Sequence, residues 1–187
     1  MKLQHQRLEV LNAENQVQRE FLPGYQMNVY GYNGSMPGPT IEVTQGDRVR
    51  IIVDNQLPEA TTVHWHGCEL PVQYDGSDKL TQNPIEPGKS FVYEFDVHEA
   101  GTFFYHSHVP MQEAFGSVGW FIVHPRHVFD PTVDRDFGLI GHEGARAPKS
   151  ARIPRNNVLV GIAQATEFEF IATTQATGCS IVLWFTT

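Results

Sequence analysis

Short runs in which apolar and polar residues alternate dominate the chain from about residue 17 to residue 125. Turn signals rich in Gly, Pro, Asn and Asp separate these runs, and helix-length stretches with a 3.6-residue period are scarce. The predicted strands are Val17–Leu22, Met27–Tyr32, Thr40–Val43, Arg48–Asn55, Thr61–His66, Ser90–Val97, Gly101–His108 and Val118–Val123. Strands this short and this evenly spaced close into a two-sheet sandwich or barrel, so the pattern predicts an all-β domain.

Two connections between the predicted strands stand out by their length. Gly67–Lys89 is the longer, and Val109–Gly116 is shorter and contains Met111, Glu113 and Phe115. Long ordered connections often carry functional residues, because a rigid scaffold positions them at the surface. We therefore expect function to lie near the strands that these two connections join.

The character of the sequence changes after residue 126, where a charged, proline-containing stretch begins. We predict an N-terminal extension over residues 1–15, one domain over residues 16–127, and a linker and tail over residues 128–187. One more strand is predicted at Asp136–His142, whereas residues 156–187 show no pattern that assigns them a fold. A length of 187 residues suits one domain, or one domain with a fragment of a second.

Composition and charge exclude several classes of partner. The formal net charge is −8 and Lys and Arg form no cluster, so nucleic acid is not an expected partner. No apolar run approaches the ~20 residues that a membrane-spanning helix needs. The first ten residues lack the apolar stretch of a secretory signal, so no signal peptide is predicted there. The two cysteines are too few and too far apart for a disulfide framework.

Four of the nine histidines form two His-x-His pairs, His64/His66 and His106/His108, inside or at the end of predicted strands. Residues i and i+2 of a strand point to the same face, so each pair can direct two imidazoles at one site. Imidazole binds Cu, Zn, Fe and Ni, and no thiolate pair nearby argues for structural zinc. The alternative is two unrelated pairs on a solvent face. Because both pairs lie beside a long connection, the sequence favours a metal site.

Four segments, in this order, resemble the first domain of laccase-like multicopper oxidases. They are residues 31–47 (GYNGSMPGPTIEVTQGD), 62–67 (TVHWHG), 84–88 (PIEPG) and 101–108 (GTFFYHSH). The resemblance covers roughly residues 17 to 126, and the combination of the two histidine motifs is far more specific than either motif alone. It implies a cupredoxin-like fold, which is a Greek-key β-sandwich or barrel.

The resemblance also implies half of a copper site. In the family, four His-x-His pairs hold a trinuclear copper cluster that reduces dioxygen to water, and the first domain supplies two of these pairs. By motif position, His64 would bind the type 2 copper, whereas His66, His106 and His108 would bind the type 3 pair. Asp75 matches an acidic residue that supports proton delivery in the family. Without the resemblance, Asp75 is equally well interpreted as part of an Asp-Gly turn.

The type 1 copper, through which electrons enter these enzymes, has no ligands on this chain. Aligning the histidine pairs with the family's type 1 motifs places Thr61, Ser107, Gln112 and Ser117 where His, Cys, His and Met would stand. Cys68 lies outside those positions, and we interpret it as a small buried residue.

Three functions follow from these observations. The first is an oxidase component that reduces dioxygen with electrons from phenols or other small reductants, and that obtains its missing half from a second cupredoxin domain or from another copy of the chain. The second is a copper-binding module without turnover, and the third is a β-sandwich interaction domain with unrelated histidines. The sequence assigns no location to this chain, whereas members of the family it resembles usually occur in the periplasm or outside the cell.

Overall fold

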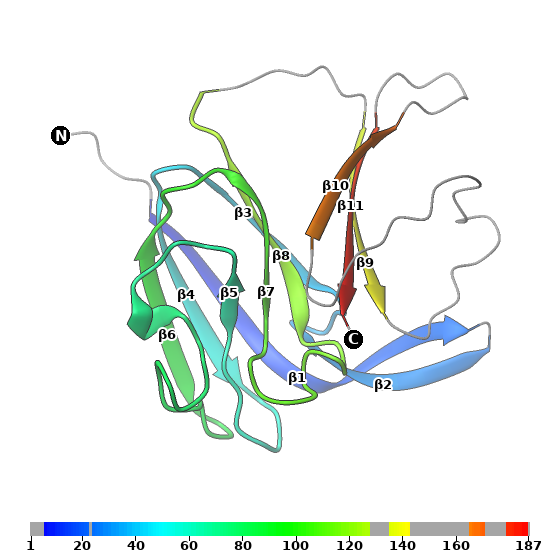
Figure 1. Ribbon diagram of the computed structural model, residues 1–187. Coiled ribbons are helices and arrows are strands. Elements are labelled where there is room, and N and C mark those ends of the chain that lie inside the picture. The colour runs from blue at the N-terminus through cyan, green and yellow to red at the C-terminus, as the bar shows by residue number, and fades with distance from the viewer. Residues whose placement is uncertain (1–5, 23, 128–134, 143–164, 171–178, 187) are drawn as a thin grey trace. The chain divides into compact units, whose positions relative to one another are not determined.

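The computed structural model describes residues 6–22, 24–127, 135–142, 165–170 and 179–186 (Figure 1). The chain divides into two compact units, Met1–Phe129 and Asp130–Thr187. The first unit contains eight of the described strands and one short 3-10 helix, η1. These elements are β1 (Gln6–Leu22), β2 (Tyr25–Tyr32), β3 (Gly38–Thr44), β4 (Arg48–Asn55), β5 (His64–His66), η1 (Val72–Tyr74), β6 (Ser90–Asp96), β7 (Gly101–His106) and β8 (Val118–His124).

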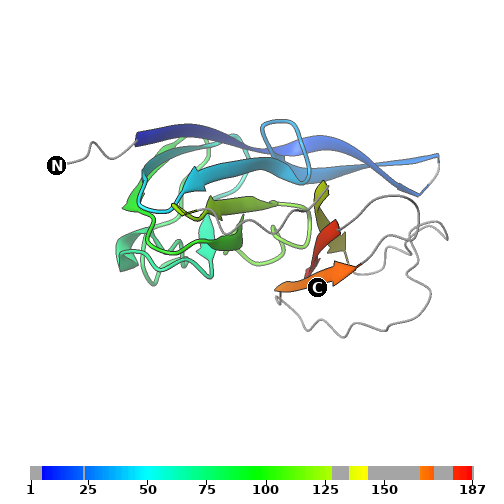
Figure 2. The same ribbon diagram turned by 90° about the horizontal axis from the view of Figure 1, so that it is seen from above.

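One sheet of the first unit has the strand order β2-β1-β4-β6. The long strand β1 pairs antiparallel with β2 through its second half and parallel with β4 through its first half. Ala13 pairs with both partners, and the register between β1 and β2 shifts between Glu14 and Val17. Figure 2 shows β1 and β2, in blue, along one side of this unit.

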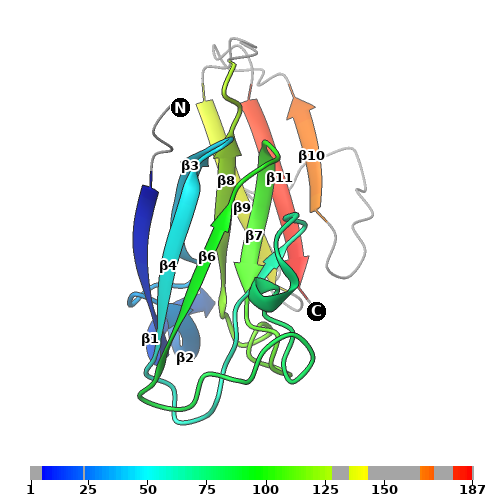
Figure 3. The same ribbon diagram turned by 90° about the vertical axis from the view of Figure 1, so that its left-hand side faces the viewer.

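The other sheet has the order β3-β8-β7-β5, with β7 antiparallel to both of its neighbours and β3 parallel to β8. Figure 3 shows β7 and β8 of this sheet with β1, β4 and β6 of the other. Neighbouring strands in each sheet are often distant in sequence, as in the β1–β4 and β3–β8 pairs. Such crossed connections are typical of Greek-key sandwiches.

The hydrophobic core lies between the two sheets. In β4, every second residue from Val49 to Asn55 is buried, which is the period expected for a strand with one face on a core. The centre is aromatic: the ring of Trp65 contacts the rings of Tyr93, Phe95, Tyr105 and Phe121, with ring centroids 5.5 to 5.7 Å apart. These ring contacts of Trp65 therefore fix the short strand β5 to the core.

The predicted all-β class is confirmed: the first unit is a sandwich of two β-sheets. Several boundaries differ. Residues 6–15, which we expected to be an extension, form the first part of β1 and pair with β4. Polar residues around Asn12 and Glu14 interrupt the apolar pattern there, but Leu11 and Ala13 are buried, so tertiary packing makes the segment a strand.

The two motif strands are shorter than predicted. Strand β5 begins at His64 rather than at Thr61, and β7 ends at His106 rather than at His108. Thr61 instead forms an isolated bridge with Ile85, at the end of the long connection. The long connection after β5 therefore pairs, near its end, with the residues that precede His64.

The described part of the second unit is a three-stranded sheet of order β10-β11-β9. Its strands are β9 (Arg135–His142), β10 (Ala165–Phe170) and β11 (Cys179–Thr186), with β11 antiparallel to β10 and parallel to β9. The strand predicted at Asp136–His142 corresponds to β9, whereas the sequence pattern had assigned no fold to the region of β10 and β11. Within the described parts of the chain, no helix is long and apolar enough to cross a membrane.

Candidate metal centre

Strands β5 and β7 bring the two His-x-His pairs together. In their antiparallel register, His64 lies directly opposite His106, Trp65 opposite Tyr105, and His66 opposite Phe104. Directly opposite residues of paired strands project from the same face. The hydrogen bonds between β5 and β7 therefore place the imidazoles of His64 and His106 side by side.

The alternation along each strand separates metal-site residues from core residues. Trp65, between His64 and His66, and Tyr105, just before His106, lie on the opposite face and are fully buried. The Tyr105 hydroxyl donates a hydrogen bond of 2.7 Å to the carbonyl oxygen of Pro39. Tyr105 also lies so close to Gly119 of β8 that a Cβ at this glycine would come within 2.3 Å of the phenol oxygen. Tight packing behind the strands thus fixes the histidines in front.

All four histidine rings gather at one place. The centroid of the His64 ring lies 5.3 to 5.4 Å from those of His66, His106 and His108, and the His106 ring lies 6.3 Å from that of His108. The ligand nitrogens of His64, His66 and His106 lie within 4.8 Å of one another. His108 joins the cluster by its ring but lies outside that set of three, because it follows the end of β7.

Hydrogen bonds at the ring nitrogens determine which nitrogen is free to bind a metal. The Nδ1 atom of His64 lies 2.6 Å from the carbonyl oxygen of Asp75, and that of His106 lies 2.9 Å from the carbonyl oxygen of Ser107. A carbonyl oxygen only accepts, so in both rings Nδ1 carries the proton and Nε2 keeps its lone pair. Metal-binding histidines commonly have such a partner on the other ring nitrogen.

His66 faces His106. The Nδ1 atom of His66 lies 3.3 Å from the Nε2 atom of His106, and the Phe104 ring stacks against both imidazoles. Two histidine nitrogens that bind one ion at about 2.0–2.1 Å, the range known for zinc, are about 3.3 Å apart at a near-tetrahedral angle. The donor types and this separation therefore fit a copper ion, for which imidazole is a suitable ligand.

Burial keeps two of the four imidazoles, those of His64 and His66, in the uncharged form. Burial lowers the pKa of His64, against the opposing effect of its hydrogen bond to Asp75. Burial, together with repulsion from His106 and His64, lowers the pKa of His66 to about 4. Both rings are therefore uncharged near neutral pH, which is the form of imidazole that coordinates metals.

Asp75, the predicted acidic residue, lies next to the cluster. It follows η1 in the long connection, and its Oδ1 atom lies 3.4 Å from the Nδ1 atom of His64. The Ser77 hydroxyl donates a hydrogen bond to the other carboxylate oxygen. Asp75 thus reaches His64 through both its backbone carbonyl and its side chain, beyond what an ordinary Asp-Gly turn explains.

A second carboxylate, which the sequence interpretation missed, lies on the other side of the cluster. The Oε2 atom of Glu113 lies 3.2 Å from the Nδ1 atom of His106. Burial raises the pKa of Glu113, but the hydrogen bond and the attraction to His106, His66 and His108 outweigh it, so the pKa is lowered. The only signal in the sequence was the position of Glu113 in the connection that follows His108.

The four residues at the aligned type 1 positions are buried and largely joined by hydrogen bonds. The carboxamide oxygen of Gln112 accepts 2.7 Å hydrogen bonds from the hydroxyls of Thr61 and Ser107, which lie 3.2 Å from each other. The backbone amide of Ser107 donates to the carbonyl oxygen of Ser117. This network contains hydroxyl and amide groups in place of the thiolate and imidazoles of a type 1 copper site.

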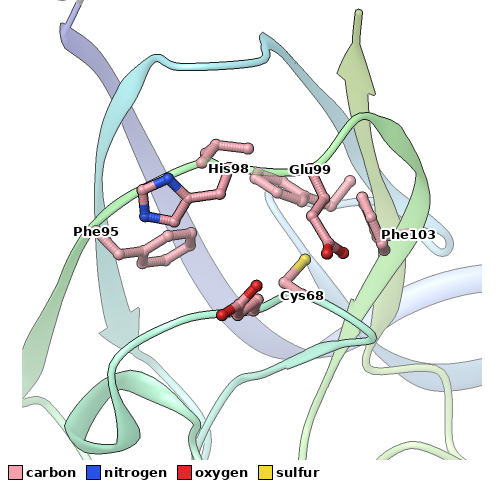
Figure 4. Close-up of a pocket in the computed structure, with 8 residues that line it drawn as sticks. Cys68, Phe95, His98, Glu99 and Phe103 are labelled. Carbon is pink, nitrogen blue, oxygen red and sulfur yellow. The ribbon is translucent and has the colours of Figure 1, made fainter.

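Cys68 lies outside the cluster. Its side chain lines a small pocket with Phe95, His98, Glu99 and Phe103 (Figure 4). Burial raises the pKa of its thiol to about 12. A thiol held in the protonated form is a poor metal ligand, which agrees with a packing role for Cys68.

Comparison with known proteins identifies the family. Residues 14–128 match the family model described as multicopper oxidase. The chain belongs to the multicopper oxidase family. Its first unit is a cupredoxin-type domain of these copper proteins, as the sequence motifs predicted, and the histidine cluster occupies the two motif strands of that domain.

The relatives include laccases and copper resistance proteins. Laccase-1 of Cryptococcus neoformans var. grubii is 44% identical over 104 residues, which are 54% of this chain and 17% of the laccase. Copper resistance protein A of Escherichia coli is 40% identical over 104 residues, 56% of this chain and 17% of that protein. The chain thus matches about a sixth of the length of these curated relatives.

Solved structures agree with this assignment. The crystal structure of a multicopper oxidase from Pseudomonas thermotolerans has a TM-score of 0.66 and 34% identity, and the match covers 74% of this chain and 33% of that chain. The multicopper oxidase mgLAC has a TM-score of 0.67 and 29% identity, with 89% of this chain and 61% of that chain covered.

Proposed function

We propose that this chain supplies half of a trinuclear copper cluster that reduces dioxygen to water. In this proposal His64 binds the type 2 copper, and His66, His106 and His108 bind the type 3 pair. The observation that carries it is the gathering of four imidazole rings from β5, β7 and the residues just after β7, with ring centroids 5.3 to 6.3 Å apart. When bound, copper would supply the redox chemistry, and the protein would hold the ions at free imidazole lone pairs.

Asp75 would take part in proton delivery. Reduction of dioxygen to water consumes protons, so a carboxylate beside the cluster is a useful donor. The Asp75 carboxylate is about one-third exposed and lies 3.4 Å from the His64 ring. It is therefore in contact both with solvent and with a proposed copper ligand.

The second half of the cluster would come from elsewhere. Four histidines are half of the eight that the family uses, so part of the coordination would fall to ligands outside this set. A further cupredoxin domain, or another copy of this chain in a symmetric assembly, would provide the rest. Oxidation of the small reductant would take place at a type 1 copper outside this domain.

A copper-binding module without turnover is the second candidate. The observation that favours it is the buried Thr61–Ser107–Gln112 network at the aligned type 1 positions. With these hydrogen bonds satisfied internally, the aligned positions would provide no electron-entry site. Copper would then be bound by the histidine cluster and retained.

Copper content measured together with native mass separates the two candidates. Three coppers per assembled site support the oxidase component, and about one copper on a monomer supports the module. Oxygen consumption with a phenolic reductant then tests turnover, and we expect a His106→Ala/His108→Ala variant to lose both copper and oxygen consumption.

His98→Ala is the matched control, because His98 is exposed and lies outside the histidine cluster. It should keep the copper content of the unmodified protein. If the double variant binds as much copper as the unmodified chain does, the histidine cluster is not the copper site and the proposal fails. If the unmodified chain and His98→Ala both bind copper but neither consumes oxygen in any assembly, the module is the correct function.

A further inference from the structure

We propose that Glu113 is a positioning residue for His106, which it holds with the proton on Nδ1 so that Nε2 stays free for copper. This inference rests on the proposed function of the histidine cluster. It adds a residue that neither the sequence motifs nor the three-histidine set contains.

The contact between the two side chains is direct. The Nδ1 atom of His106 lies 3.2 Å from Oε2 of Glu113, and the side chain of His106 is only 7% exposed. An enclosed N–H group needs an acceptor within the protein, because an unpaired buried donor destabilises the fold. The Ser107 carbonyl at 2.9 Å is one acceptor and the Glu113 carboxylate is the other.

A carboxylate does more here than the carbonyl. Its negative charge makes the hydrogen bond charge-assisted and increases the basicity of the ring, which strengthens Nε2 as a ligand. The Glu113 carboxylate also attracts the rings of His66 and His108 when these carry positive charge. The same field favours a cation bound among these histidines.

The backbone around Glu113 is anchored, so the carboxylate is held in place. The preceding residue, Gln112, uses both ends of its amide: the nitrogen donates to the carbonyl oxygen of Ala60 at 2.9 Å and to Glu59 at 3.1 Å, while the oxygen accepts from Thr61 and Ser107. Glu113 itself is tied by its carbonyl oxygen to the amide of Gly116 at 2.9 Å. A carboxylate on an anchored turn can fix the orientation of a ring.

The two sides of the cluster are built alike. His64 and His106 lie opposite each other in the β5–β7 register, and each has a carboxylate near its Nδ1 atom, from Asp75 at 3.4 Å and from Glu113 at 3.2 Å. The difference lies in the principal acceptor. His64 has the backbone carbonyl of Asp75 at 2.6 Å, whereas the Nδ1 atom of His106 is shared between a carbonyl and a side chain.

The test compares Glu113→Ala and Glu113→Gln with the unmodified full chain, and uses Glu86→Gln as control because Glu86 is exposed in a loop. Two quantities are measured: the dissociation constant for copper, added alone and competed with a chromophoric chelator, and the ¹⁵N shifts of the His106 ring in the metal-free protein. A His106→Gln variant assigns the ring signals. The thermal midpoint of each metal-free variant reports its folding.

We expect Glu113→Ala to raise the copper dissociation constant about 10–100-fold, as other outer-sphere partners do. Its His106 signals should show a fraction of the second tautomer, with the proton on Nε2, because only the Ser107 carbonyl then holds the proton on Nδ1. Glu113→Gln, which keeps an acceptor oxygen but loses the charge, should fall between, and it carries the test if Glu113→Ala does not fold. Glu86→Gln should match the unmodified chain.

The inference is overturned if the Glu113 variants keep the His106 tautomer of the unmodified chain, or if they bind copper within twofold of it. Failure of the unmodified chain to bind copper would overturn the proposed function instead. The ring measurement on metal-free protein still decides the role of Glu113 in that case, so the two failures are distinguishable.

Discussion

The Nδ1 atom of His64 lies 2.6 Å from the backbone carbonyl oxygen of Asp75. This hydrogen bond joins β5 to the long connection between β5 and β6, eleven residues further along the chain. Because the acceptor is a backbone atom, the position of the loop, rather than the identity of its side chain, fixes the His64 ring. Backbone and carboxylate of Asp75 therefore have roles that can be tested separately.

The backbone role can be tested at Gly76. Gly76 has φ +81° and a Cβ there would lie 1.9 Å from the carbonyl oxygen of Val63, so Gly76→Ala must displace the loop. The left-handed conformation alone costs a non-glycine residue about 1–2 kcal/mol. We expect a loss of about 2–4 kcal/mol in the free energy of unfolding, measured in urea, together with weaker copper binding.

Gly34→Ala is the control for that measurement. Gly34 has φ +71°, but a Cβ there would meet nothing within 4 Å. It should cost only the conformational term of about 1–2 kcal/mol and leave copper binding unchanged. Equal losses in the two variants would show that the packing of the loop against Val63 does not matter.

The carboxylate role can be tested with Asp75→Asn. This change keeps the carbonyl that accepts from His64 and removes the acid, so copper content should stay the same. In a preparation that consumes oxygen, we expect the rate to fall about 10²-fold or more, the effect of losing a positioned proton donor. Full activity in an Asp75→Asn protein with full copper would exclude Asp75 from proton delivery.

The network around Gln112 should contribute strongly to stability. Gln112→Leu leaves the carbonyl of Ala60 and the hydroxyls of Thr61 and Ser107 without their amide partner in a buried place. At about 1–3 kcal/mol for each buried polar group that loses its partner, we expect a loss of about 2–5 kcal/mol in the free energy of unfolding. Gln73→Leu, at an exposed residue of η1, should change it by less than about 0.5 kcal/mol. If Gln112→Leu changed the free energy of unfolding as little as Gln73→Leu does, the network around Gln112 would not contribute to stability.

Cys68 should be unreactive in the folded protein. Burial raises the pKa of its thiol to about 12, so almost no thiolate forms in the folded state at pH 8. We expect alkylation by iodoacetamide, read by peptide mass spectrometry, to be at least about tenfold slower in the native chain than in urea. Because the thiol pKa is higher in the folded than in the unfolded protein, its contribution to the free energy of unfolding is fully present below pH 9.0. This contribution is lost as the pH rises toward 12. Equal labelling rates in native and unfolded protein at pH 8 would refute the burial of this thiol.

The alternation of apolar and polar residues was sufficient to predict the all-β class and most strands. Strand β4 has the bounds that were predicted, because Val49, Ile51 and Val53 alternate with polar residues. The pattern failed at residues 6–15, where burial of Leu11 depends on a partner strand more than thirty residues away. A local pattern carries no information on that partner.

The sequence by itself determined that His64 and His66 point to one face, since this follows from the two-residue period of a strand. Only the tertiary structure decided that the two pairs meet, with His64 opposite His106, and that Glu113 reaches His106. Strand register and loop path depend on contacts between distant residues, such as the packing of Trp65 and Tyr105 behind the histidines and the hydrogen bond from Thr61 to Gln112. The spacing of residues along the chain does not encode those contacts.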